Sequence, residues 1–232
     1  AKFGWGPYGA GTVEADAAQV AAAREGLGEE GVLLVDAGTI WKHDLAAAEQ
    51  RLPALQAVGA TWLEEPFATG ALGAYRRLAE MSGSVRIAGG EGSHTEDMAR
   101  HMIDLAGVGF IQIDAGRIGG ISPAKRVADY AQAHGVVYVN HTFTSHLALS
   151  ASLQPYAGHP AGAICEYPME LKSLAREITC EHIERDADGM VNLPDAPGLG
   201  MTPNLEAARR YLLDVEISIG GKTLYRTPEL AA

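Results

Sequence analysis

The sequence predicts an α/β fold in which a parallel sheet, covered by helices, curves into a (β/α) barrel. Short apolar runs alternate with Ala-rich amphipathic stretches over the first 166 residues, which is typical of strands and helices alternating in a parallel sheet. The chain has 232 residues, 47% of them hydrophobic, which is enough for one sizeable core. Acidic or basic residues follow the apolar runs at a regular spacing, which favours a barrel over an open sheet.

The predicted strands are short apolar runs at residues 31–35, 61–63, 85–88, 108–113, 136–139 and 163–165. Predicted helices lie at 44–58, 72–81 and 146–153, and two more begin at Thr95 and Ser122. Pro53 is expected to kink the first helix. Acidic residues suit the first turn after Thr95, where the helix dipole favours them. Pro123 suits the first helical position after Ser122.

The texture of the sequence changes after residue 166. Residues 186–202 are rich in Gly, Pro and Asp and are expected to form turns, followed by a helix at 204–213. Residues 216–225 are expected to form a hairpin around Gly220 and Gly221. We therefore expect barrel units in residues 1–166, and in 167–232 a C-terminal segment of helix plus hairpin that packs against the barrel within the same domain.

The formal net charge of −11 argues against nucleic acid and anionic membranes as partners, because such a surface repels both. No apolar run reaches the roughly 18 residues that span a bilayer, and no signal-peptide pattern opens the chain. Cys165 and Cys180 form neither a metal-ligand pair nor a disulfide framework, so we expect a reduced, cytoplasmic setting. The same charge would repel an anionic substrate unless the site carries positive charge of its own.

Six functional groups follow the strand runs at steps of 23 to 28 residues: Asp36, Glu64, Glu91, Asp114, His141 and Glu166. This step is the length of one strand-loop-helix-loop unit. In a barrel the carboxyl ends of all strands meet at one mouth, so these groups would converge there.

Three of the six, Asp36, Glu64 and Glu91, are carboxylates on consecutive strands. They repel one another unless a cation lies between them, and hard oxygen ligands suit Mg²⁺. Glu65 directly follows Glu64. Because successive strand side chains face opposite ways, only one of this pair is expected to line the mouth, and the spacing does not say which.

Five segments resemble the mandelate racemase/muconate-lactonizing family of the enolase superfamily, and they occur in the family's order. They are WLEEPF at 62–67, GGEGSH at 89–94, IDAGRIGGIS at 113–122, NHTF at 140–143 and PDAPGLGM at 194–201. The resemblance runs from Lys2 to about Met201. It implies the family's modified TIM barrel, the carboxyl end of which holds a metal and two bases.

The resemblance also implies roles for single residues. The metal ligands of strands three, four and five would be Asp36, Glu64 and Glu91, and the choice within the Glu-Glu pair falls on Glu64. A catalytic dyad would be formed by Asp114 and His141, and Glu166 would be the mouth acid of strand eight. Lys2, followed by Phe3 and Gly4, resembles the second lysine of the family's Lys-x-Lys motif, the base of strand two, and would lie opposite His141 across the metal.

The implied activity is Mg²⁺-dependent removal of the proton next to a carboxylate, leading to dehydration of a sugar acid or hydroxy acid through an enediolate. A racemase or epimerase of a hydroxy acid is the alternative. The expected partners are a small carboxylate substrate and further copies of the chain, since an exposed parallel edge strand invites association.

The position of Lys2 predicts a barrel that begins at unit two, so that strand one and the family's capping domain are expected to be absent. Residues 1–166 would then hold units two to eight. A barrel with seven strands in place of eight leaves open a different class of function, an inactive fragment or a binding scaffold that keeps only the family's shape.

Overall fold

The computed structural model describes residues 1–142, 144–159 and 164–229. The chain divides into two compact units. The first consists of Ala1–His141 and Pro155–Ile164, and the second of Thr142–Gln154 and Cys165–Ala232. Residues 142–154 thus belong to the second unit although they precede residue 166, and the domain boundary expected there stays a prediction.

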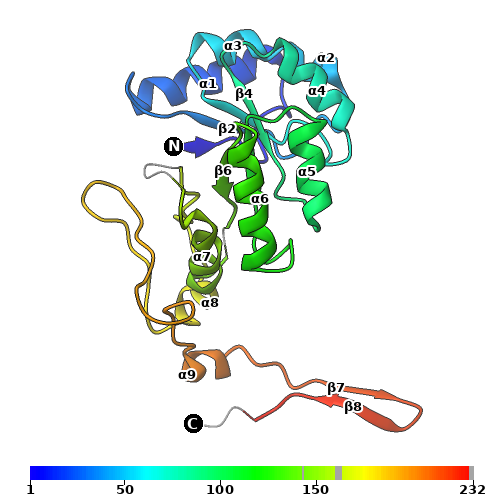
Figure 1. Cartoon of the computed structure of the whole chain (residues 1–232), viewed down its shortest axis with the longest axis vertical. Helices are drawn as coiled ribbons and strands as arrows, with labels where there is room; N and C mark the ends of the chain where they lie inside the picture. The colour runs from blue at the N-terminus through cyan, green and yellow to red at the C-terminus, as the bar shows by residue number, and fades with distance from the viewer. Residues whose placement is uncertain (143, 160–163, 230–232) are drawn as a thin grey trace. The chain divides into compact units, whose positions relative to one another are not determined.

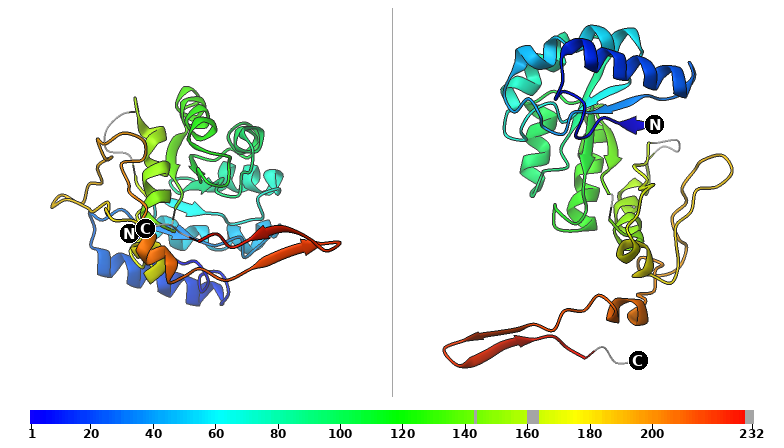
Figure 2. Two further views of the ribbon diagram at one scale, coloured as in Figure 1. Left: turned by 90° about the horizontal axis from the view of Figure 1, so that it is seen from below. Right: turned by 180° about the vertical axis from the view of Figure 1, so that it is seen from behind.

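The first unit is built on a parallel sheet in which, over the described residues, six strands follow the order β1-β2-β3-β4-β5-β6. The strands are β1 (Lys2–Phe3), β2 (Leu34–Asp36), β3 (Trp62–Glu64), β4 (Arg86–Gly89), β5 (Phe110–Ile113) and β6 (Val137–Asn140). Each strand pairs with the next one along the chain, which is the order of a (β/α) barrel and not of a doubly wound sheet. The sheet curls, with the helices of this unit outside it, so the predicted barrel class is confirmed as a six-stranded half-barrel (Figure 2).

Six helices of the first unit connect the strands and lie along the outer side of the sheet (Figure 1). They are α1 (Val13–Leu27), α2 (Leu45–Glu49), α3 (Leu52–Ala57), α4 (Leu72–Met81), α5 (Glu96–Asp104) and α6 (Ile121–Ala133). Helices α4, α5 and α6 pack against β4, β5 and β6 respectively, and α5 packs against α6. The predicted helices at 72–81 and from Thr95 are confirmed, and the Thr95 side chain accepts a hydrogen bond from the Met98 N–H.

The two faces of the sheet are both buried, as expected for parallel strands. Five residues of the inner face form one packed cluster: Leu34, Trp62, Ala88, Phe110 and Val139. The rings of Trp62 and Phe110 meet edge to face at 5.0 Å. The alternate residues of the same strands are buried on the outer side, with Val35, Leu63 and Ile87 in register.

Two helix boundaries differ from the prediction, for local reasons. The helix predicted at 44–58 is divided into α2 and α3 at Gln50 and Arg51, because Pro53 lies in the first turn of α3 and cannot donate to a preceding turn. Helix α6 begins at Ile121 and not at Ser122, directly after Gly120, which adopts a φ of +123°.

Helix α1 was not predicted, although Thr12 caps its first turn by accepting from the Ala15 N–H. Only Asp16 and Val20 of its 15 residues are buried, so the sequence carries almost no apolar period to identify it. The short strand predicted at 163–165 is corrected in part. Ile164 and Cys165 form no strand, and Ala163 lies outside the described residues.

The second unit contains α7 (His146–Leu153), α8 (Ser173–Glu177), α9 (Leu205–Arg209) and the antiparallel hairpin of β7 (Glu216–Ile219) and β8 (Lys222–Arg226). A 3₁₀ turn (Gln154–Tyr156) follows α7, and its last two residues belong to the first unit. The predictions for α7 and for the hairpin are confirmed. Helix α9 is shorter than predicted, and α8 was not predicted. In the part of the chain that the structure describes, no helix is long and apolar enough to cross a membrane.

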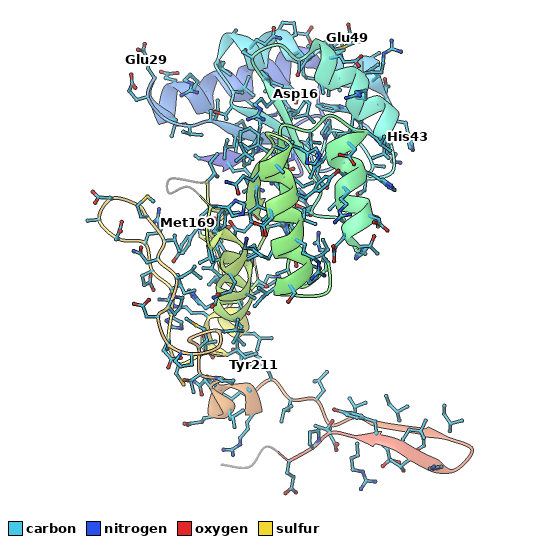
Figure 3. The ribbon with its side chains drawn as sticks, viewed as in Figure 1. Asp16, Glu29, His43, Glu49, Met169 and Tyr211 are labelled. Atoms are coloured by element: carbon cyan, nitrogen blue, oxygen red, sulfur yellow. The ribbon has the colours of Figure 1, made fainter. Side chains whose placement is uncertain are left out.

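A buried ion pair ties the segment after β1 to two helices. Arg51 Nε donates to Asp16 Oδ2 at 2.9 Å, and both side chains are nearly inaccessible to solvent (Asp16 is labelled in Figure 3). The other Asp16 oxygen accepts from the Gly9 N–H, and Arg51 also donates to the carbonyl of Gly11. The pair therefore holds residues 9–11, which follow the strand that carries Lys2.

We predict that Arg51→Met lowers the free energy of unfolding by about 3 kcal/mol, because it leaves the Asp16 carboxylate buried without its charge partner. The matched control is Arg76→Met, which removes an exposed pair with Glu80 at 3.7 Å and should change the same quantity by less than about 0.5 kcal/mol. Urea unfolding followed by circular dichroism measures both. Equal losses in the two variants would contradict the structural role of the buried pair.

Candidate active site

The functional groups of the first unit gather at the carboxyl ends of its strands. Asp36 and Glu64 are the last residues of β2 and β3 and are direct register partners. Glu91 follows β4, while Asp114 and His141 directly follow β5 and β6. Lys2, on β1, is in register with Leu34, two residues before Asp36, and so lies on the same face as Asp36. Contacts within this unit join these six residues in two groups.

The first group is a lysine held by two buried carboxylates. Lys2 Nζ lies 2.8 Å from Glu64 Oε1 and 3.4 Å from Asp36 Oδ2. The Glu64 side chain is fully buried, and the Asp36 side chain is 8% exposed. Burial raises the pKa of Asp36, the Lys2 ammonium opposes this effect, and the charge of Glu91 adds to it. The ammonium thus supplies the positive charge that these carboxylates need.

The second group is a histidine between two carboxylates. His141 Nδ1 lies 2.9 Å from Asp114 Oδ2, and His141 Nε2 lies 2.9 Å from Glu91 Oε2. The imidazole is almost fully buried. A neutral imidazole carries one N–H, so donating to both carboxylates at once requires the imidazolium form. The contact between Asp114 and His141 that the resemblance implies is present, and it fixes the orientation of the ring.

Arg117 completes the second group, and the sequence reasoning did not single it out. Its guanidinium Nη1 donates to Glu91 Oε1 at 2.9 Å. The Arg117 and Gly116 N–H groups donate to Asp114 Oδ1. The signal was available, since Arg117 stands three residues after Asp114 inside the segment IDAGRIGGIS.

The acids of the second group have lowered pKa values. Burial alone would raise the pKa of Glu91, but hydrogen bonds from His141 and Arg117 outweigh it and hold this pKa at about 2. Burial would also raise the pKa of Asp114. Hydrogen bonds from His141 and from two backbone N–H groups outweigh this effect, so the pKa of Asp114 is lowered. Both carboxyl groups are therefore ionised at neutral pH.

Glu65 does not follow the alternation expected from the sequence. It adopts a left-handed φ of +40°, so the strand geometry of β3 ends at Glu64. Burial, followed by the charges of Glu91 and Asp36, raises the pKa of Glu65 to about 8. The charges of carboxylates from both groups thus act on Glu65, and the expectation that only one of the pair lines the mouth stays a prediction. The strained backbone is of the kind that concentrates at functional sites.

The three candidate metal ligands are not gathered around one point. Among the described residues, no group of three His, Cys, Asp or Glu side chains is arranged to hold a metal ion. The reason is visible in the contacts: Lys2 is held by Asp36 and Glu64, while Glu91 turns to His141 and Arg117. The donor set still fits Mg²⁺, because it consists of carboxylate oxygens only, and two of them stand on adjacent strands in register. The triad Asp36, Glu64 and Glu91 stays a prediction.

Glu166 belongs to the second unit, where its Oε2 accepts a hydrogen bond from the Thr142 N–H at 2.8 Å. Its role as the mouth acid stays a prediction. The second unit also holds a cavity of about 510 Å³ lined largely by polar groups, among them His146, Tyr167, Arg176 and Glu184. None of the predicted site residues lines this cavity, and six of the seven lie in the first unit.

Known proteins match this chain over most of its length. The family model for enolase C-terminal domain-like proteins matches residues 1–208. The crystal structure of a predicted mandelate racemase from Rhodobacter sphaeroides superimposes with a TM-score of 0.93 at 60% identity, over 98% of this chain and 58% of that one. A racemase from Streptomyces coelicolor A3(2), solved with bound magnesium, gives a TM-score of 0.74 at 27% identity, over 90% of this chain and 53% of that one.

Two curated relatives are named for different reactions. D-galactarolactone cycloisomerase from Agrobacterium fabrum is 29% identical over 220 residues, which are 90% of this chain and 55% of the relative. Arabinonate dehydratase from Saccharolobus solfataricus is 31% identical over 198 residues, 84% of this chain and 51% of the relative. The chain spans about half the length of these relatives. They act as an isomerase and a dehydratase respectively.

The lowered pKa of Glu91 predicts a pH-dependent effect of Glu91→Gln on stability. Because the pKa is about 2 in the folded chain against an ordinary 4.5, the ionised carboxylate stabilises the fold above pH 4.5, and this contribution is lost as the pH falls towards 2. The variant should lower the free energy of unfolding by about 2 to 3 kcal/mol at pH 7, and by progressively less below pH 4.5. Urea unfolding at pH 7, 4 and 3 with chelator present measures this difference.

Glu80→Gln is the control for this series, since that side chain is 63% exposed and should show no comparable pH-dependent loss. A difference between Glu91→Gln and the unsubstituted chain that stays constant from pH 7 to pH 3 would contradict stabilisation by the ionised carboxylate.

Proposed function

This chain belongs to the enolase C-terminal domain-like family, and from that premise we propose that it carries the catalytic barrel groups of a Mg²⁺-dependent, cytoplasmic enzyme that removes the proton next to the carboxylate of a sugar acid or hydroxy acid. The proposed outcome is dehydration, a lyase reaction. The proposal draws on the dehydratase and isomerase relatives, and on the magnesium bound by the Streptomyces racemase.

One observation carries the proposal. Two groups able to exchange protons come from the two edge strands of the sheet and reach the same row of carboxylates. Lys2 on β1 contacts Asp36 and Glu64, and His141 after β6 contacts Glu91. A substrate held at this row would have a proton-transferring group at either side. Structural ion pairs alone do not require such groups at both edges.

The chemistry explains why positive charge is needed here. A proton next to a carboxylate is very weakly acidic, because its loss leaves a dianionic enediolate. Mg²⁺, held by Asp36, Glu64 and Glu91, would supply the charge that stabilises such a dianion. It would also answer the repulsion that a chain of net charge −11 exerts on an anionic substrate.

The chain's own residues would move the protons. Lys2, as the neutral amine, takes the proton from the carbon next to the carboxylate. His141, kept as the imidazolium by Asp114, gives a proton to the hydroxyl on the following carbon, which leaves as water. The resulting enol becomes a 2-oxo acid when the carbon that lost the hydroxyl gains a proton and the enol hydroxyl loses one. Glu166 is proposed as the mouth acid that contacts the substrate.

Racemisation is the second candidate, because a crystal structure that is 60% identical to this chain is described as that of a predicted mandelate racemase. The same two groups serve it equally well. One would remove the proton and the other would return a proton to the opposite face, without loss of water. The substrate class and the presence of a leaving hydroxyl decide between the two reactions.

We predict that the chain with Mg²⁺ exchanges the proton next to the carboxylate of at least one sugar acid for deuterium in D₂O, and that a 2-oxo acid accumulates. Asn in place of His141 should slow product formation by about 10² to 10⁴-fold, since it removes a proton donor. Proton NMR over a panel of aldonates and aldarates measures exchange and product together. His43→Asn, at an exposed position on the loop after β2, is the matched control and should have no effect.

Exchange without loss of water would contradict dehydration and favour racemisation. Absence of exchange across the panel, with Mg²⁺ bound, would contradict the enzymatic proposal and favour a scaffold that keeps only the family's shape.

We predict opposite effects of two substitutions on Mg²⁺ affinity. Lys2→Met removes the ammonium that competes with the metal for Asp36 and Glu64, so affinity should rise by about tenfold. Glu91→Gln removes a charged ligand and should weaken binding by at least about tenfold. Isothermal titration calorimetry measures both affinities. The control is Lys125→Met, which removes an exposed ion pair with Asp129 and should leave Mg²⁺ affinity unchanged. A Lys2→Met variant with weaker Mg²⁺ binding would contradict the competition.

A further inference from the structure

We infer that Trp5 is a substrate-contacting residue that presents an indole face to the carbon chain of the sugar acid, beyond the carbons that react. The inference rests on the proposed function, and it deepens that function by assigning recognition of the polyol part of the substrate. Trp5 lies three residues after Lys2, on the segment that leaves β1. Three residues span at most about 10 Å, so the backbone of Trp5 lies within about that distance of the backbone of the proposed base.

Trp5 differs sharply from the other tryptophans. The structure describes all three of the chain: Trp62 is 1% exposed, Trp41 is 7% exposed, and Trp5 is 75% exposed. Trp41 and Trp62 are packed in the core of the first unit. Trp5 therefore gains little of the burial free energy that holds Trp41 and Trp62 in the core, and most of its ring is available for contact with a ligand.

The turn that carries Trp5 is held in place. The Tyr8 N–H donates to the Gly4 carbonyl at 2.9 Å and closes the turn of residues 4–8 that carries Trp5. Tyr8 is buried and meets Trp41 edge to face. Gly4 adopts a φ of +118°, and a side chain there would collide with the Asp36 carbonyl at 2.6 Å. The turn therefore lies directly against the end of β2.

The indole is also fixed against the backbone next to the candidate metal ligand Asp36. A Cβ placed on Gly38 would lie 2.8 Å from Trp5 Cδ1, so the ring rests against Gly38. The N–H of Gly38 donates to Asp36 Oδ1 at 2.8 Å. One part of the ring thus contacts the turn that orients Asp36, and the remainder is open to solvent.

This arrangement suits one class of ligand. A sugar acid bound by its carboxylate at the row of carboxylates extends a chain of carbons, each of which carries a C–H group as well as a hydroxyl. An aromatic face, which is electron-rich, attracts the slightly positive C–H groups. A rigid ring gives this contact with little loss of conformational freedom. A short hydroxy acid such as lactate has no carbons that reach the ring.

The test uses the full chain with Mg²⁺ and a panel of aldonates and aldarates, with lactate as the short comparison acid. Trp5→Ala should weaken binding of the best panel member by about five- to tenfold in calorimetry and raise KM by a similar factor. It should leave lactate and Mg²⁺ binding unchanged, which also shows that the variant is folded. Trp5→Phe keeps an aromatic face and should lose no more than about threefold. Tyr225→Ala, on the exposed hairpin, is the control.

Tryptophan fluorescence gives a readout that a structural role would not move. Trp5 is the accessible tryptophan, so acrylamide should quench it in the free chain, and the bound panel member should protect it while lactate should not. A panel member that binds Trp5→Ala as well as the unsubstituted chain, with no protection of Trp5, would overturn the inference and leave the proposed function standing. Failure of every panel member to bind in the presence of Mg²⁺ would overturn the proposed function as well.

Discussion

The constraint on which the site depends is the repulsion between carboxylates buried together at the carboxyl end of one sheet. Asp36 and Glu64 end two strands, and Glu65 and Glu91 follow strands. The first three are buried and Glu91 is partly buried, which makes their charges costly. Parallel strands with helical crossovers bring such residues to one end whatever their distance in sequence. The fold therefore creates a demand for positive charge that something must meet.

In the chain alone this demand is met in three ways. Lys2 serves Asp36 and Glu64, Arg117 and His141 serve Glu91, and a raised pKa keeps Glu65 protonated over part of the pH range. Lys2 and His141 are the proposed proton-transferring groups, and Arg117 contacts the Glu91 carboxylate beside them. Under the proposed function, metal binding and release of Lys2 would be linked, because an ion held by the carboxylate oxygens would displace the ammonium from them. This linkage would keep the proposed base idle until the metal is bound.

The sequence predicted that Asp36, Glu64, Glu91, Asp114 and His141 meet at one end of the sheet, and the family resemblance implied the contact of Asp114 with His141, but the other contacts were not predicted. The regular step from Asp36 to His141 reports strand-to-strand repeats, and repeats determine which residues reach one end of the sheet. Which acid pairs with which base depends on side-chain geometry across strands, so the turn of Glu91 towards His141 and Arg117 was not foreseen. The conformation of Glu65 was not predicted, because its left-handed backbone departs from the alternation of side chains along a strand. Helix α1 was not predicted, because it buries too few apolar residues to give a helical periodicity in the sequence.

A crystal structure of the chain grown with Mg²⁺, compared with one grown in chelator, tests the central claim most directly. The account predicts one ion bound by oxygens of Asp36, Glu64 and Glu91 at about 2.1 Å, with Lys2 withdrawn from Glu64 and with Glu91 released from His141. An ion bound elsewhere, or the Lys2–Glu64 contact of 2.8 Å unchanged with the ion present at these residues, would contradict it.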